Sequence, residues 1–219
     1  MNADLPERLA ERLAQPLAGL ADDARFASSR PGPRAGEIPG GARFAAVLAL
    51  LYPIGGGQWH LPLTLRPRHL PDHGGQISLP GGAVEPGESS RAAALRELHE
   101  ELGAADAEPA ILGRLSPIYV QVSNFRVAPF VGACRRRPDF RPNPAEVEEL
   151  LEIPLSHLLD PANLSRHERL HQGKTYRAPH FSWRGHKIWG ATCLILGELL
   201  TIIESIAAAS AEDQADPAP

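Results

Sequence analysis

The chain has 219 residues, of which 43% are hydrophobic and 22% are charged. These proportions are those of globular proteins, and the length suits one domain with appended segments. A wholly disordered chain, a collagen-like fibre and a small disulfide-stapled protein are therefore excluded, since only two cysteines are present. Lys and Arg total 22 against 26 Asp and Glu, which gives a formal charge of −4. No overall positive field gathers nucleic acid, so a phosphate-rich ligand must be held locally.

The first twenty residues do not read as a targeting segment. Asp4, Glu7 and Glu11 interrupt the apolar residues, unlike a secretory signal or an acid-poor transit peptide. Leucines recur at every fourth position: Leu5, Leu9, Leu13 and Leu17. This spacing predicts an amphipathic helix as the N-terminal segment 1–27, with Asp4 as its N-cap.

The next elements are punctuated by glycine and proline, beginning with a linker at 28–41. Runs at 43–52 and 58–66 predict a hairpin around the glycines 55–57, and 89–102 predicts a helix that Ser89 or Ser90 caps and Gly103 ends. We expect further strands at 118–122 and 125–131, a short strand and helical turn in 146–159, a hairpin at 170–183 and a last helix at 189–208. The body is then one domain at 42–208, followed by a disordered tail at 209–219.

The sequence favours the cytoplasm. The apolar run 188–197 stops at Glu198, far short of the ~20 residues that cross a bilayer, so we expect no membrane span. Cys134 and Cys193 lack CxxC spacing and are expected to be buried thiols in a reducing compartment.

The helix at 89–102 carries the densest chemistry. At about 100° per residue, Glu97, Glu100 and Glu101 fall within an arc of roughly 100°, while leucines cluster on another side. Neighbouring carboxylates destabilise a helix unless a cation lies among them. Clustered oxygen ligands suit Mg²⁺ or Mn²⁺, which can keep positions open for water and phosphate.

Residues around these glutamates fit the same interpretation. Arg96 can pair with a carboxylate and orient it, and Glu88 lies at the helix start within reach of the same face. The pair Gly81-Gly82 permits a tight loop whose backbone can approach a metal or a phosphate. A solvated acidic helix face is the alternative for an isolated ExxEE pattern.

The complete spacing resembles the Nudix box. The matching residues are Gly82, Glu88, Arg96, Glu97, Leu98, Glu100, Glu101 and Gly103, with Ala104 where a larger aliphatic residue is usual. The resemblance implies an α/β/α sandwich with a mixed sheet that hydrolyses a nucleoside diphosphate linked to another moiety. It also implies a metal site made by Glu97, Glu100 and Glu101 with support from Glu88 and the Gly81 carbonyl, oriented by Arg96. Glu146 is our candidate general base, with an ordinary surface glutamate as the alternative.

The stretch 63–82 places Arg66, Arg68, His69 and His73 just before the box, where cations would bind further phosphates. This stretch resembles the signature of coenzyme A-type Nudix hydrolases. The matches are Thr64, Arg66, Gly75, Pro80, Gly81 and Gly82, and the departures are Pro62, Pro67, Pro71 and Leu79. The resemblance, which covers roughly 43–205, implies cleavage of coenzyme A or an acyl derivative into 3′,5′-ADP and 4′-phosphopantetheine.

Other interpretations stay open at this point. The substrate can instead be ADP-ribose or an NADH-type dinucleotide. A catalytically inactive nucleotide sensor would be expected to lack a box glutamate, and none is missing. The HExxH pattern at 167–171 would bind zinc only on a helix, whereas its surroundings predict a hairpin. We expect no nucleic-acid or membrane partner, and the oligomeric state is open, with a homodimer as one option.

Overall fold

The computed structural model describes residues 4–20, 23–27, 39–70, 73–171 and 173–215. Its helices are α1 (Leu5–Leu13), α2 (Ser90–Leu102), α3 (Leu155–Leu159) and α4 (Gly190–Ala215), with a 3₁₀ turn at Pro161–Asn163. Its strands are β1 (Arg43–Ile54), β2 (Gln58–Leu65), β3 (Ile77–Ser78), β4 (Gly81–Ala83), β5 (Ala110–Arg114), β6 (Ile118–Val120), β7 (Phe125–Ala133), β8 (Glu149–Pro154), β9 (Leu164–His171), β10 (Lys174–Trp183) and β11 (His186–Trp189).

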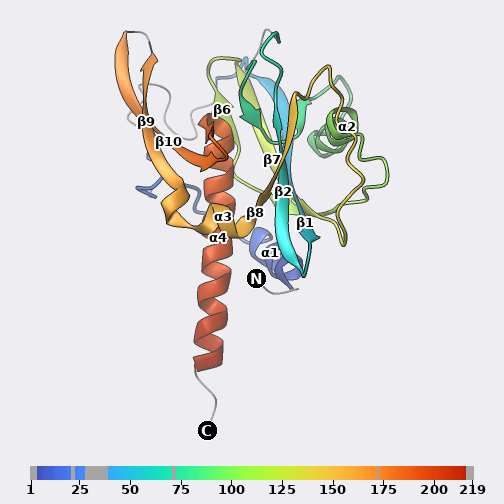
Figure 1. The fold of residues 1–219 in the computed structure, drawn as a ribbon, viewed down its shortest axis with the longest axis vertical. Coiled ribbons are helices and arrows are strands. Elements are labelled where there is room, and N and C mark those ends of the chain that lie inside the picture. Colours follow the sequence, from blue (N-terminus) through green and yellow to red (C-terminus); the bar gives the residue numbers. More distant parts are fainter. Residues whose placement is uncertain (1–3, 21–22, 28–38, 71–72, 172, 216–219) are drawn as a thin grey trace.

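The main sheet has eight strands and is mixed. β1 runs parallel to β7, with Leu48 opposite Phe130, and antiparallel to β2 and β4. β8 pairs with β2, and β5 and β6 pair with β7. Helix α2 covers one face, while α1 and α4 lie on the other (Figure 1). The predicted α/β/α sandwich with a mixed sheet is therefore confirmed.

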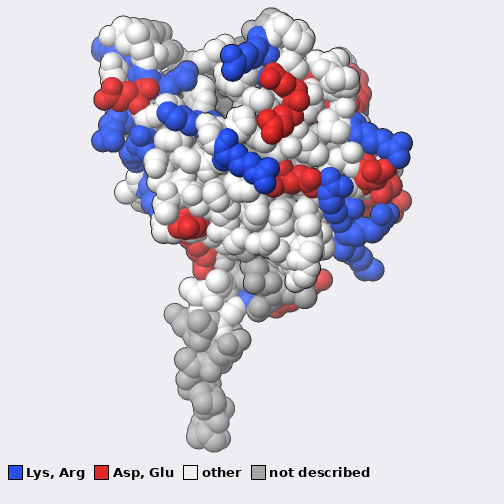
Figure 2. Space-filling view, viewed as in Figure 1, with Lys and Arg blue, Asp and Glu red and all other residues white. Residues whose placement is uncertain are grey.

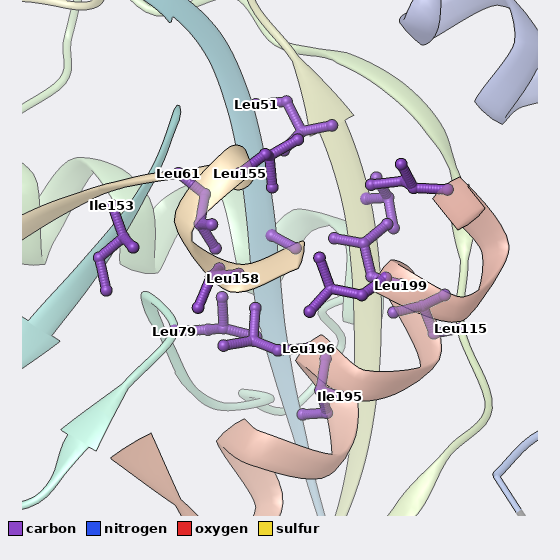
Figure 3. Packing of buried hydrophobic residues seen from close by; sticks show 14 of the residues in the cluster. Leu51, Leu61, Leu79, Leu115, Ile153, Leu155, Leu158, Ile195, Leu196 and Leu199 are labelled. Carbon is purple, nitrogen blue, oxygen red and sulfur yellow. The ribbon is translucent and has the colours of Figure 1, made fainter. Parts of the chain in front are cut away.

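Strand β1 separates two hydrophobic cores because its side chains alternate between the two faces. Ala46, Leu48 and Leu50 pack in the core under α2, whereas Ala49 and Leu51 belong to the core under α1 and α4. Figure 3 shows the larger core, where leucines and isoleucines of β1, β2, α3 and α4 meet. A strand covered on both faces is apolar throughout, which is the pattern of 43–52.

The N-terminal helix is shorter than the predicted segment 1–27. It ends at Leu13, because Pro16 removes a donor and disfavours helical backbone in the residue before it. Asp4 occupies the N-cap position as predicted, but its side chain makes no capping hydrogen bond. Leu17 lies beyond the helix but still packs against the larger core. Of the predicted linker, 28–38 lies outside the described residues.

The C-terminal helix is longer than predicted. Helix α4 continues through the expected end at 208 to Ala215, so the tail predicted at 209–219 is wrong up to that residue, and 216–219 lies outside the described residues. Glu198 does not interrupt it: the carboxylate is buried and accepts hydrogen bonds from the amide and the hydroxyl of Ser116, at 2.9 and 2.6 Å.

By length and composition alone, Gly190–Ser210 could cross a membrane. Half of this stretch is buried inside the protein, where Leu196, Leu199 and Ile203 pack in the larger core. These contacts are those of a core helix, whose apolar side chains face the body of the domain.

A second, three-stranded sheet consists of β9, β10 and β11, all antiparallel. The hairpin predicted at 170–183 is confirmed, although its first strand begins earlier, at Leu164. This sheet packs on α4 and lies beside β3 at the edge of the main sheet. We call it the C-terminal sheet.

Candidate active site

The site is built on β4 and α2, which follow each other in the chain. The hydroxyl of Ser89 accepts a hydrogen bond from the third following amide at 3.1 Å, so the predicted N-cap is confirmed. Gly103 ends the helix in the left-handed conformation, with φ of 58°. Leu98 and Leu102 are fully buried against the sheet, which fixes the rotation of α2 and turns its glutamates toward β4.

Two glycines allow β4 to pack closely against β1 on one side and α2 on the other. A Cβ atom on Gly82 would lie 2.3 Å from Glu97 Oε1, and one on Gly81 would lie 2.3 Å from the carbonyl oxygen of Ala46. Gly81 N–H donates to Glu101 Oε2 at 3.3 Å. Gly82 is therefore needed to leave space for the Glu97 carboxylate, and Gly81 is needed for the close approach of β4 to β1. The amide of Gly81, as a hydrogen-bond donor, holds the Glu101 carboxylate.

Three carboxylates converge in front of β4. Ligand oxygens of Glu97, Glu101 and Glu146 lie within 4.8 Å of one another. Glu97 and Glu101 are one helical turn apart on α2, whereas Glu146 comes from the segment before β8. We call these three residues the acidic cluster. Sequence reasoning selected all three, and the structure brings them together.

The acidic cluster is electrostatically strained. Burial raises the pKa of Glu101 to about 8, against the lowering effect of the Arg66 guanidinium. Burial also raises the pKa of Glu97, while the ion pair with Arg96 opposes the shift. Neighbouring carboxylates resist simultaneous ionisation, and a divalent cation among them relieves that repulsion. Hard oxygen donors at this spacing fit Mg²⁺ or Mn²⁺.

Glu88 and Glu100 lie outside the acidic cluster and belong to the ion pairs of Arg96. This guanidinium donates to Glu88 Oε1 and Oε2 at 3.0 and 3.2 Å, to Glu97 Oε1 at 3.0 Å and to Glu100 Oε2 at 2.7 Å. It also donates to the carbonyl oxygen of Ala83 at 3.0 Å. The pKa of Glu88 is lowered mainly by its hydrogen bonds to Arg96. Arg96 thus ties α2 to β4 and holds the Glu97 carboxylate, as expected of an orienting residue.

Sequence reasoning missed the role of Asn143. Its amide N–H donates to the carbonyl oxygen of Glu101 at 2.8 Å, and its side-chain Nδ2 donates to Glu146 Oε1 at 3.3 Å. The side-chain oxygen accepts from the amide of Ala145 at 3.1 Å. Asn143 therefore fixes the loop that carries Glu146. An Asn-Pro pair, which favours such turns, is the signal that could have identified it.

The loop between β2 and β3 brings one of the four predicted substrate residues to the acidic cluster. Arg66 Nη1 lies 3.4 Å from Glu101 Oε1. Arg68 and His69 are exposed on the loop, and His73 Nδ1 lies 3.1 Å from Gln76 Oε1. Pro71, a predicted departure from the signature, lies outside the described residues. The loop is closed by main-chain hydrogen bonds from Arg66 to Gln76 and from Gly75 to Arg66, at 3.0 and 2.9 Å.

The HExxH pattern lies on strand β9, as expected, so it lacks the helix that a zinc-protease site requires. His167 Nδ1 lies 3.2 Å from Nδ1 of His180 on β10, and burial lowers the pKa of both imidazoles. The two rings form a local contact within the C-terminal sheet.

Comparisons with known proteins agree with this geometry. The family model described as "NUDIX domain" matches residues 42–174, more than half of the chain. The chain is 36% identical over 180 residues to "Uncharacterized Nudix hydrolase NudL" of Yersinia enterocolitica, which covers 80% of this chain and 88% of that protein. It is 35% identical over 159 residues to "Nudix hydrolase 15, mitochondrial" of Arabidopsis thaliana, a match that covers 69% of this chain and 55% of that protein. A solved Nudix hydrolase from M. smegmatis, RenU, is similar at 18% identity, with a TM-score of 0.46 over 77% of this chain and 87% of that one.

Proposed function

The chain belongs to the Nudix hydrolase family, and on that basis we propose that it cleaves the diphosphate of coenzyme A or of an acyl-coenzyme A. The products would be 3′,5′-ADP and 4′-phosphopantetheine or its acyl form. The proposed compartment is the cytoplasm, in keeping with the free, buried Cys134 and Cys193.

One observation carries the choice of substrate. The loop whose residues resemble the coenzyme A signature folds back on the acidic cluster, with the Arg66 guanidinium 3.4 Å from Glu101. Thr64, another signature residue, is buried and lies 3.1 Å from the Ser78 hydroxyl, which ties β2 to β3 on either side of the loop. A guanidinium at this position can bind a diphosphate oxygen while the exposed Arg68 and His69 lie within the same loop.

The chemistry assigns a task to each member of the acidic cluster. Glu97 and Glu101 would hold Mg²⁺ or Mn²⁺, with Arg96 orienting Glu97 and the Gly81 amide orienting Glu101. When bound, the ion would offset the charge of the diphosphate and lower the pKa of a water molecule. Glu146, held by Asn143, would accept the proton of that water. The water oxygen bonds to one phosphorus, and the bridging oxygen leaves with the other phosphate.

Product analysis tests this proposal. Purified protein with Mg²⁺ or Mn²⁺ is offered coenzyme A, ADP-ribose, NADH and a nucleoside triphosphate in parallel. We expect selective release of 3′,5′-ADP from coenzyme A. Turnover of ADP-ribose or NADH alone would refute the coenzyme A assignment and leave diphosphate hydrolysis intact, whereas inactivity on all four would favour a nucleotide sensor.

Glu146→Gln separates the two possible tasks of that residue. Loss of turnover with unchanged Mn²⁺ affinity, measured by calorimetry, is expected of a base. Loss of Mn²⁺ affinity to the same degree as in Glu97→Gln would make Glu146 a metal ligand instead.

A further inference from the structure

The C-terminal sheet is strongly basic although the chain as a whole is acidic. Residues 164–189 contain six Lys or Arg and one acidic residue, Glu168. The rest of the chain contains sixteen Lys or Arg and twenty-five Asp or Glu. Figure 2 shows blue side chains gathered over β9 and β10 at the upper left. The charge is therefore distributed asymmetrically, because this one small sheet has a net positive charge and the rest of the chain a net negative one.

Several of these cations keep their charge available to solvent. Arg166 donates to the main-chain carbonyls of Ala24 and Ala27, at 2.8 and 2.7 Å, and pairs with no acidic side chain among the described residues. Arg169 stacks over Trp189, with its guanidinium carbon 3.8 Å from the ring centroid. Lys174 and Lys187 are exposed. Exposed cations without an acidic partner project a positive potential into the surrounding water.

This sheet lies beside β3, the strand that follows the loop carrying Arg66. β11 packs against β3, and Thr192 at the start of α4 donates to the carbonyl oxygen of Ile77 at 3.0 Å. His186 Nε2 on β11 lies 3.4 Å from Glu149 Oε2, and Glu149 is paired with Leu65, the residue before Arg66. The basic surface is thus joined through β3 and β8 to the edge of the active site.

We propose that the C-terminal sheet draws polyanionic substrates to the acidic cluster and favours substrates that carry phosphate groups beyond the diphosphate. The inference rests on the proposed function, because coenzyme A carries one such additional phosphate. Without this sheet, the surplus of acidic residues elsewhere in the chain would repel an anion. A positive surface at the edge of a site raises the capture rate of anions, and salt weakens the effect.

The test reverses charge on the sheet and on a matched surface. The double variant Lys174→Glu with Lys187→Glu changes the sheet. The control, Arg114→Glu with Arg135→Glu, makes the same charge change at two exposed positions in or beside the main sheet, the last residue of β5 and the second residue after β7. kcat and kcat/KM are measured for coenzyme A and dephospho-coenzyme A at 10 and 100 mM salt. Affinity for 3′,5′-ADP, measured by calorimetry, gives a readout that needs no turnover.

We expect the lysine double variant to lose kcat/KM for coenzyme A on the order of five-fold at 100 mM salt and several times more at 10 mM, with kcat unchanged. The loss should be smaller for dephospho-coenzyme A, and the arginine double variant should stay within two-fold of the wild type. Equal losses in both double variants, or none in either, would overturn the inference. So would a lysine variant that keeps kcat/KM but no longer binds RNA or anionic vesicles.

Failure of the proposed function gives a different result. If the wild-type protein cleaves only ADP-ribose, the coenzyme A assignment fails, while the weaker binding of 3′,5′-ADP to the lysine double variant still supports capture by the basic sheet. Unchanged binding of 3′,5′-ADP in that variant overturns the inference whichever substrate is cleaved.

Discussion

Glu101→Gln is expected to lower turnover about a thousand-fold and yet to stabilise the metal-free protein at alkaline pH. Glu101 is 1% exposed and lies among like charges, so its ionised form is costly in the folded state. Glutamine has nearly the same shape and cannot ionise. The substitution therefore separates the catalytic value of this carboxylate from its cost to the fold.

The pKa of Glu101 sets the size and sign of the effect. Burial raises this pKa from 4.5 to about 8, so the folded chain retains a proton that the unfolded chain has already released. Below pH 4.5 the Glu101 carboxyl is protonated in both states and does not reduce the free energy of unfolding. As the pH rises from 4.5 to 8, the free energy of unfolding of the wild-type protein falls. By linkage the cost is about 3 kcal/mol at pH 7. For a chain of this size, that corresponds to a difference in Tm of about 6–12 °C.

The assay is thermal unfolding of wild type and variant between pH 4.5 and 8.5, with and without Mg²⁺. Without metal, the two Tm values should coincide near pH 4.5, and the variant should be higher at pH 8. Mg²⁺ should raise the Tm of the wild type only, because binding to the folded state alone stabilises it. Turnover should fall about a thousand-fold. Glu108→Gln, at an exposed site, is the matched control.

Two results would refute this reasoning. A metal-free variant less stable than the wild type at pH 8 would mean that the Glu101 carboxylate contributes more through its contacts than it loses by burial. Turnover within ten-fold of the wild type would remove Glu101 from the set of metal ligands.

Three further predictions test the geometry around the acidic cluster. Gly82→Ala should lower turnover about a hundred-fold in a folded protein, because the new methyl group would displace the Glu97 carboxylate; circular dichroism with kinetics checks this, and unchanged turnover contradicts it. Ser89→Ala should lower the free energy of unfolding by about 1 kcal/mol through loss of the N-cap, measured by urea denaturation. Glu100→Gln should lower turnover less than ten-fold, since Glu100 pairs with Arg96 and its side chain is half exposed; a loss equal to that of Glu101→Gln would indicate that Glu100 binds the metal.

The sequence was most informative where structure is set locally. Helix α2 has its cap, its terminating Gly103 and its leucine stripe within fifteen residues, and its predicted and observed ranges agree to within one residue. The fixed spacing of the box places Glu97 and Glu101 one turn apart on any helix. Both the helix and two of the three members of the acidic cluster were therefore predictable from neighbouring residues alone.

Features that depend on distant partners were predicted less well. Strand β5 was not predicted from the sequence, because it is short and contains Gly113 and a register shift. It forms because it pairs with β7 and packs against Leu13 of α1. The contact of Asn143 with Glu101 joins residues that are far apart in the sequence. Only the folded chain shows that Asn143 secures both an α2 glutamate and the loop of Glu146.

The positions of the α2 glutamates around the helix explain how their side chains are divided between two sets of contacts. Taking Glu97 as the reference direction, Glu101 lies about 40° to one side, whereas Glu100 lies about 60° and Arg96 about 100° to the other. The arc therefore contains two pairs of neighbouring side chains, Glu97 with Glu101 and Arg96 with Glu100. The structure follows this division, with Glu101 turned to the Gly81 amide and Glu100 turned to Arg96. Glu97 lies between the two and joins them, because its carboxylate belongs to the acidic cluster and also accepts a hydrogen bond from Arg96.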